Sequence, residues 1–149
     1  MPGGGCPVNP GNRRLAEILA NARTIAVVGL SGDPGRASHR IASYLRNAGY
    51  RIIPVNPEAA EVLGEKTRRS LAEIDEPVDI VDVFRRPAHI PPVAGEALRM
   101  TRRPGAFWMQ KGIAHAECAR KLEEAGIEVV QDLCIKTAHR LLLAGQPSG

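Results

Sequence analysis

An apolar run that ends in a glycine-rich loop is the feature that most constrains the fold of this chain. Residues 24–29 read Thr-Ile-Ala-Val-Val-Gly, and further glycines follow at 32 and 35 before a helical pattern begins at Ser38. A buried strand that breaks at glycine and leads into a helix presents backbone N–H groups beside the positive end of the helix dipole. We therefore predict a phosphate-binding loop here, with a plain strand-to-helix connection as the alternative.

The glycine spacing argues against an ordinary dinucleotide site. Gly29, Gly32 and Gly35 do not follow the G-x-G-x-x-G pattern, and the loop before Ser38 is longer than that tight turn. A dinucleotide fold also places Asp or Glu near the end of the second strand, where it binds the ribose hydroxyls, and this chain has Asn56-Pro57 there. The loop therefore predicts a phosphate-binding site, but its glycine spacing argues against NAD as the ligand.

Length and composition indicate one domain. The chain has 149 residues, of which 44% are hydrophobic, and we expect a domain at 12–143 between disordered tails at 1–11 and 144–149, which lack apolar periodicity. No run approaches the roughly 20 apolar residues of a membrane span, and the start lacks the apolar segment of a signal peptide. Three widely separated cysteines make no disulfide framework. These features favour a cytoplasmic protein without membrane contact.

The charge pattern favours a small anionic ligand over nucleic acid. The formal net charge is +4, and the arginine doublets at 13–14, 68–69, 85–86 and 102–103 are spread along the chain. Aromatic residues make up only 3% of the chain, which leaves little for base stacking. No nucleic acid partner is expected.

Apolar patterns predict alternating helices and strands. Helices are expected at 13–22, 38–48, 91–100, 114–125 and 135–143, with Asn12 and Ser38 as N-caps of the first two. Strands are expected at 24–29, 50–55, 78–84, 105–109 and 127–131. This α/β order implies a mostly parallel five-stranded sheet covered on both faces. Ligands of such sheets bind beyond the carboxyl ends of the strands.

Five segments at these strand ends carry a family resemblance. They are Ile-Ala-Val-Val-Gly at 25–29, Ile-Pro-Val-Asn-Pro at 53–57, Pro-Val-Asp-Ile-Val-Asp-Val-Phe-Arg-Arg at 77–86, Trp-Met-Gln-Lys-Gly-Ile at 108–113 and residues 126–134. Together they resemble the stand-alone CoA-binding domain proteins, which are similar in turn to the CoA-binding domain of succinyl-CoA synthetase alpha subunits. The resemblance implies a Rossmann-like three-layer sandwich that binds coenzyme A. Leu133 departs from the pattern, because an arginine commonly stands there.

The parts of CoA match the residue types at the first two strand ends. The pyrophosphate would take backbone donors from Gly29, Leu30, Ser31, Gly32 and the helix start at Ser38. The 3′-phosphate would pair with guanidinium groups, for which Arg36 and Arg40 are nearest in sequence. The pair Asn56-Pro57 would adjoin this phosphate without the repulsion that a carboxylate would exert.

The pantetheine arm requires an apolar groove with a few polar contacts. The candidates for it lie at the ends of the third and fourth strands: Phe84, Trp108, Met109 and Gln110. Ordinary core packing is the alternative for Phe84 and Trp108, and Arg85 either faces the ligand or pairs with an acidic side chain.

The sequence offers little for catalysis. The histidines are scattered along the chain and do not have the spacing of metal ligands. We expect surface or capping roles for all four: His39, His89, His115 and His139. Cys134 follows the fifth strand and is either a site thiol that exchanges with CoA or a small buried residue.

We therefore expect a non-catalytic CoA-binding protein that acts as a carrier, a sensor or a subunit in acyl-CoA metabolism. Its ligand would be CoA or an acyl-CoA, and a second copy of the chain or an acyl-CoA enzyme is a candidate partner. A nucleotide-dependent oxidoreductase and an interaction module with a vestigial pocket are the alternatives.

Overall fold

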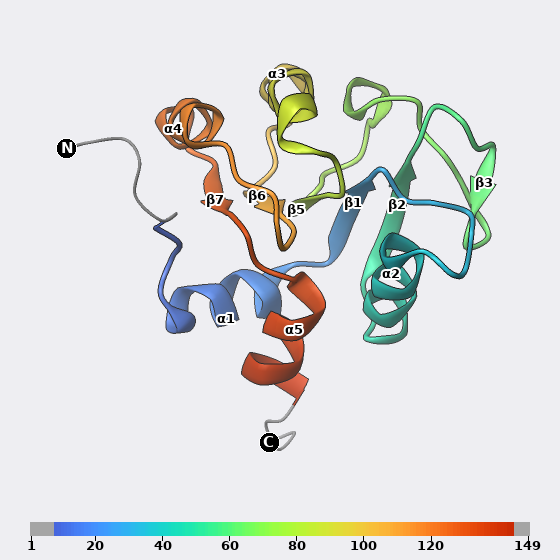
Figure 1. The fold of residues 1–149 in the computed structure, drawn as a ribbon, viewed down its shortest axis with the longest axis horizontal. Helices are drawn as coiled ribbons and strands as arrows, with labels where there is room; N and C mark the ends of the chain where they lie inside the picture. The colour runs from blue at the N-terminus through green and yellow to red at the C-terminus, as the bar shows by residue number, and fades with distance from the viewer. Residues whose placement is uncertain (1–7, 145–149) are drawn as a thin grey trace.

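A five-stranded parallel sheet forms the centre of the computed structural model, which describes residues 8–144 (Figure 1). Its spatial order is β2-β1-β5-β6-β7, and each neighbouring pair is parallel. The strands are β1 Thr24–Val28, β2 Arg51–Val55, β5 Ile80–Val83, β6 Ala106–Met109 and β7 Glu128–Val130. The predicted α/β Rossmann-like fold is confirmed, and the sheet is parallel throughout.

Helices cover both faces of the sheet (Figure 1). One face carries α1 Asn12–Asn21, α2 Ala37–Asn47 and α5 Ile135–His139, and the other carries α3 Ile90–Arg99 and α4 Ala116–Glu124. Because side chains alternate along a strand, Trp108 packs in the apolar cluster of the first face and Phe107 in that of the second. Both faces are buried, which explains the nearly continuous apolar strands.

Helix starts differ from the prediction at two places. Asn12 is the first residue of α1, and Gly11 holds the N-cap position without a side-chain bond. Ser38 lies inside the first turn of α2, where its Oγ accepts the N–H of Ser31 at 3.0 Å. Both capping predictions were wrong, since each side chain lies one or two positions too far into the helix to serve as its N-cap.

The histidines have mixed roles. His115 caps α4, because its Nδ1 accepts the N–H of Cys118 at 3.2 Å. His139 is buried against Tyr44 and Tyr50, and its Nδ1 is 2.8 Å from the Tyr44 hydroxyl. Burial lowers the pKa of His139. The expectation of a surface or capping role is confirmed for His115 and wrong for His139, which the apolar face of the last helix carries into the core.

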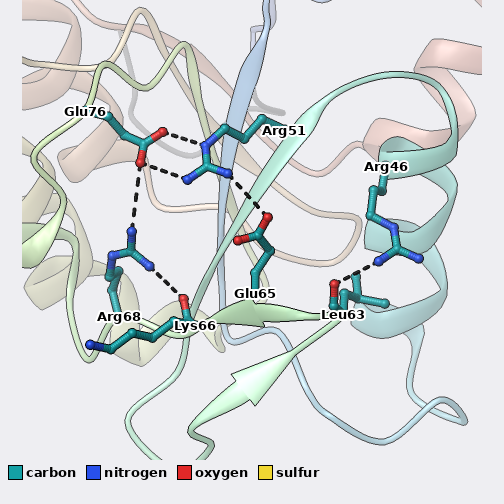
Figure 2. Close-up of polar contacts among 7 residues, drawn as sticks. All are labelled: Arg46, Arg51, Leu63, Glu65, Lys66, Arg68 and Glu76. Atoms are coloured by element: carbon teal, nitrogen blue, oxygen red, sulfur yellow. Dashed lines mark hydrogen bonds and ion pairs between the residues drawn. The ribbon is translucent and has the colours of Figure 1, made fainter.

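A short hairpin, β3 Glu61–Val62 and β4 Glu65–Lys66, follows β2 and was not predicted. Figure 2 shows how polar side chains attach it to the sheet edge. Arg51 of β2 contacts Glu76 at 2.6 Å and Glu65 at 3.3 Å, and Arg46 of α2 donates to the Leu63 carbonyl at 2.8 Å. Such exposed pairs add little stability, so their main effect is to fix the segment between β2 and β5 in place.

The chain ends were predicted to be disordered tails, and residues 1–7 and 145–149 lie outside the described residues. Residues 8–11 are described. There the Asn9 side chain donates to the Gln131 carbonyl at 2.8 Å and accepts the Gln131 N–H at 2.7 Å, so it occupies the open edge just past β7. At the other end, α5 continues as a π-helical turn, Arg140–Ala144. Among the described residues, no helix has the length and apolar character that a bilayer crossing requires.

Candidate functional site

A cleft of about 440 Å³ opens at the carboxyl ends of β1, β2 and β5. It is lined by Gly29, Ser31, Arg36, Ala37, Ser38, Asn56, Glu58, Phe84 and Arg85. The chain leaves β1 through α2 toward β2, whereas β5 flanks β1 on the other side. This is the switch point at which parallel sheets bind ligands. The structure brings seven of the predicted site residues together here: Gly29, Ser31, Arg36, Ser38, Asn56, Phe84 and Arg85.

Gly29 allows the ends of β1 and β5 to approach closely. Its φ is +84°, and a Cβ built on it would lie 2.5 Å from the Phe84 carbonyl oxygen. The same position is 3.5 Å from Arg85 Nε, so the Arg85 side chain extends over this glycine. A larger residue would therefore strain the backbone and push the β5 loop away.

The loop after Gly29 is held by its own polar groups. The Ser31 N–H donates to Ser38 Oγ, the Asp33 N–H donates to Ser31 Oγ at 3.0 Å, and the Gly35 N–H donates to Asp33 Oδ1 at 2.9 Å. The Arg36 N–H donates to the Asp33 carbonyl at 3.0 Å. The first amides of α2 have no acceptor within the helix, and two of the residues that carry them, Ala37 and Ser38, line the cleft. The loop is thus shaped before any ligand arrives.

Charges of both signs line the cleft. Arg36 is exposed, and Arg85 is half-buried. Glu58 is also exposed here and was not singled out from the sequence, although it directly follows Asn56-Pro57. Asn56 itself has a structural role: its Nδ2 donates to the Leu30 carbonyl at 2.9 Å, and its Oδ1 accepts the Glu58 N–H at 2.8 Å. Asn56 therefore fixes where Glu58 enters the cleft.

Several predicted residues do not line the cleft. Leu30 is fully buried, and Gly32 and Pro57 are exposed beside the cleft. Arg40 donates from Nη1 to the Gly35 carbonyl at 2.5 Å, which ties α2 to the loop. Arg40 thus has a partner within the protein.

The predicted residues at the end of β6 lie in the core. Trp108 and Met109 have no exposed surface, and Gln110 is 4% exposed. Trp108 Nε1 donates to the Leu133 carbonyl at 2.8 Å, and Gln110 Oε1 accepts the N–H of Ile135 at 3.0 Å. These side chains hold the start of α5 against the sheet, and contact with a ligand would require them to move.

Cys134 and Asp82 lie on the α5 side of this end of the sheet. Cys134 is half-buried at the N-cap position of α5. Burial alone would raise its pKa, but the N–H groups of Thr137 and Lys136, the Thr137 hydroxyl and the Gln110 side chain outweigh this effect and lower it. Asp82 has no exposed surface, and neither of its carboxyl oxygens has a hydrogen-bond partner among residues 8–144. Burial raises the pKa of Asp82 well above its usual value.

Two of the other cavities lie at the opposite end of the sheet. One of about 580 Å³ is lined by Thr24, Tyr50, Arg51 and His139, among others, and one of about 130 Å³ by Arg14, Asp79 and Glu128. Both are at the amino ends of the strands. Across the described part of the chain, no three His, Cys, Asp or Glu side chains are grouped so that they could hold a metal ion.

Comparison with known proteins assigns the family. Residues 23–140 match the family model described as a CoA-binding domain. The chain belongs to this CoA-binding domain family. An uncharacterised protein of Bacillus subtilis, YneT, is 50% identical over 131 residues, which cover 88% of this chain and 96% of that protein. The resemblance found in the five sequence segments is confirmed.

Solved structures and a longer relative agree with this assignment. The structure of cell-free ID.343 from Thermus thermophilus has a TM-score of 0.85 and 43% identity, covering 90% of this chain and 100% of that one. A hypothetical protein from Pyrococcus horikoshii has a TM-score of 0.86 and 30% identity, covering 96% of this chain and 99% of that one. The ADP-forming acetate–CoA ligase I of Archaeoglobus fulgidus is 31% identical over 121 residues, which are 80% of this chain but 18% of the ligase.

Proposed function

We propose that this CoA-binding domain protein holds coenzyme A or an acyl-CoA in the cleft at the ends of β1, β2 and β5. One observation carries the proposal: the cleft at the switch point of a CoA-binding fold combines a preformed glycine loop, the first amides of α2 and two arginines, Arg36 and Arg85. Amides at a helix start and guanidinium groups are the donors that phosphate groups prefer. The cleft therefore suits the phosphates of CoA.

Each part of the ligand is assigned to a part of the cleft. The pyrophosphate lies against the Gly29–Gly32 loop and the start of α2 near Ser38, and Arg36 meets the 3′-phosphate. Arg40 supports this contact through its bond to the Gly35 carbonyl. The pantetheine arm leaves the cleft along Phe84 and Arg85 toward the end of β6. Trp108, Met109 and Gln110 are buried there, so they support the strand end and the start of α5 without contacting the arm. Leu30, Asn56 and Pro57 shape the wall on the β2 side.

The role we propose is binding without catalysis of acyl transfer, as a carrier, a sensor or a subunit. A ligase named for acetate and CoA contains a region similar to this chain, so a partner with acyl-CoA chemistry is a reasonable one to test. A second copy of this chain is the other candidate partner.

Glu58 favours a second candidate, a nicotinamide dinucleotide. In dinucleotide folds an acidic residue beyond the second strand binds the ribose hydroxyls, and Glu58 reaches the cleft from that position. The glycine spacing still argues against it, because Gly29 and Gly32 leave a wider loop than the dinucleotide turn. The two candidates differ in what Glu58 does: it would repel the CoA 3′-phosphate but bind the ribose of NAD.

Calorimetric titration of the protein with CoA and with NAD separates the candidates. We expect CoA to bind and to stabilise the fold, by about 2.7 kcal/mol at a concentration of 100 Kd, while NAD has little effect. Glu58→Gln should leave CoA binding intact or tighten it. Tighter binding of NAD than of CoA, abolished by Glu58→Gln, would replace the proposal with the oxidoreductase alternative. No binding of either nucleotide would favour an interaction module with a vestigial pocket.

A further inference from the structure

Among the described residues that line the cleft, Glu58 alone is acidic, whereas Arg36 and Arg85 are basic. The guanidinium groups attract the phosphates of a ligand, and a carboxylate repels them. Glu58 is exposed, so a ligand in the cleft meets its charge directly. How strongly Glu58 repels a phosphate depends on the distance between the two charges, and therefore on where the backbone at Glu58 is held.

Thr67 holds the two residues that follow Glu58. The Thr67 hydroxyl donates to the Ala59 carbonyl, and the Thr67 N–H donates to the Ala60 carbonyl at 3.1 Å. Thr67 is only 9% exposed, so little water competes for these bonds. On the other side, the Asn56 side chain accepts the Glu58 N–H at 2.8 Å. The backbone at Glu58 is therefore held from both sides.

Beyond Thr67 the chain is bonded directly to β2. The Arg68 N–H donates to the Pro54 carbonyl, and the Arg68 carbonyl accepts the Asn56 N–H, both at 2.9 Å. The Arg68 side chain reaches the Glu76 carboxylate at 3.8 Å (Figure 2). Thr67 thus has a fixed place relative to the end of β2, and its two bonds extend this constraint to the segment that lines the cleft.

The hairpin β3–β4 also packs against the glycine loop. A Cβ built on Gly32 would lie 4.0 Å from Cγ2 of Val62, which is an ordinary contact distance, and Val62 is buried. Arg46 of α2 donates to the Leu63 carbonyl at the turn of the hairpin (Figure 2). The hairpin is thus braced against β2, against α2 and against the loop that leads to Arg36.

We propose that this hairpin sets the ligand selectivity of the cleft: Glu58 limits the affinity for the CoA 3′-phosphate, and Thr67 is the residue that positions Glu58. The inference rests on the proposed binding of CoA in the cleft with its 3′-phosphate beside Arg36. Arg36 attracts that phosphate and Glu58 repels it, so the preference for CoA over dephospho-CoA is the difference between two opposed effects. CoA therefore binds less tightly than the two arginines alone would allow.

The test is calorimetric titration of the parent protein and its variants with CoA and with dephospho-CoA. Glu58→Gln should raise the preference for CoA by about 3- to 5-fold at low salt, the effect of one unit charge a few ångströms away in water. Thr67→Val removes the hydroxyl donor but keeps the shape of the side chain, and it should raise the preference by a smaller factor because Glu58 is then less well held. Thr67→Ser keeps the donor and should retain the parent's preference.

The double variant distinguishes positioning from a general loss of structure. In the Glu58→Gln background, Thr67→Val should leave the preference for CoA unchanged, because no charge remains to be positioned. The inference is overturned if Thr67→Val lowers the affinity for both ligands by the same factor, or if its effect on the preference is the same with and without Glu58.

Amide hydrogen exchange of the free protein tests the positioning without any ligand. Thr67→Val should speed exchange at the Glu58 amide and leave that of Ala26, in the middle of the sheet, unchanged. Equal exchange at Glu58 in the two proteins would show that Thr67 does not position it. If the parent binds neither CoA nor dephospho-CoA, the proposed function fails as well. Binding of both ligands with a preference that Glu58→Gln does not raise overturns this inference alone.

Discussion

The carboxyl ends of β1 and β5 form an open cleft, whereas the neighbouring ends of β5 and β6 are sealed beneath α5. In the first region Arg36 and Glu58 are exposed and the loop hydrogen-bonds to itself. In the second region Asp82 and Trp108 have no exposed surface. Both regions occupy the edge of the sheet at which ligands of this fold class bind. The comparison teaches that a place at the carboxyl edge of a parallel sheet does not by itself make a strand end accessible to a ligand, because a covering helix can bury it.

Replacing Gly29 by valine should have the largest effect, because it forces the ends of β1 and β5 apart. The positive φ disfavours any β-branched residue, and the Cβ would meet the Phe84 carbonyl oxygen. We expect a loss of about 3 kcal/mol or more in the free energy of unfolding, measured by chemical denaturation. Gly32→Ala is the control: its nearest contact would be Val62 at 4.0 Å, so stability should change by less than about 0.5 kcal/mol. Equal effects would contradict the close approach of β1 and β5.

Asp82→Asn should change how stability depends on pH. The folded-state pKa of Asp82 is raised by burial, so above its unfolded pKa the folded chain keeps a proton that the unfolded chain loses. The free energy of unfolding should then fall as pH rises from about 4 toward the folded-state pKa, by up to about 1.4 kcal/mol per pH unit. The asparagine variant should lack this decline in denaturation series at several pH values. Parallel curves for the two proteins would show that Asp82 is paired or hydrated.

Arg36→Ala should remove the discrimination between CoA and dephospho-CoA, which differ by the 3′-phosphate. We expect the parent protein to prefer CoA by about 1.5–3 kcal/mol, the usual strength of a hydrogen bond to a charged group. Arg40→Ala is the matched comparison. Because Arg40 already donates to the Gly35 carbonyl, Arg40→Ala should lower the affinity for CoA and for dephospho-CoA by similar amounts in calorimetry. If Arg40→Ala instead removed the preference for CoA and Arg36→Ala did not, Arg40 would be the residue that binds the 3′-phosphate.

Ser38→Ala should have the smallest effect, confined to the open region. It removes the acceptor of the Ser31 N–H, which should cost about 1 kcal/mol in stability and loosen the loop. Ser43→Ala, on the same helix, should cost less than about 0.5 kcal/mol. Thermal denaturation with and without CoA measures both effects. If CoA binding is unchanged in Ser38→Ala, the loop does not need its internal bonds to hold the ligand.

The sequence predicted the five strands and their parallel arrangement because both faces of the sheet are buried and the strands are almost wholly apolar. The hairpin at Glu61–Lys66 was missed, since strands of only two residues are too short to show periodicity, and Gly64 was its one signal. Glu58 was missed because the prediction stopped at Asn56-Pro57. The burial of Trp108 depends on where α5 lies, and that position is set by distant contacts rather than by neighbours in sequence.

The unpaired state of Asp82 could not be predicted for a similar reason. Asp79, three residues earlier in the same run, accepts the N–H groups of Arg23 at 2.8 Å and Thr24 at 3.0 Å. The two aspartates look alike in sequence, and only the packing of neighbouring segments gives one of them partners.

The most direct test of the central claim is to map CoA binding on the backbone amides by NMR. The account predicts the largest shifts at Gly29–Ser38, Asn56–Glu58 and Phe84–Arg85. The amino ends of the strands, including the larger cavity lined by Tyr50, Arg51 and His139, should be unaffected. Shifts concentrated around Tyr50 and His139, with the Gly29 loop unchanged, would contradict the claim and place the ligand at the opposite edge of the sheet.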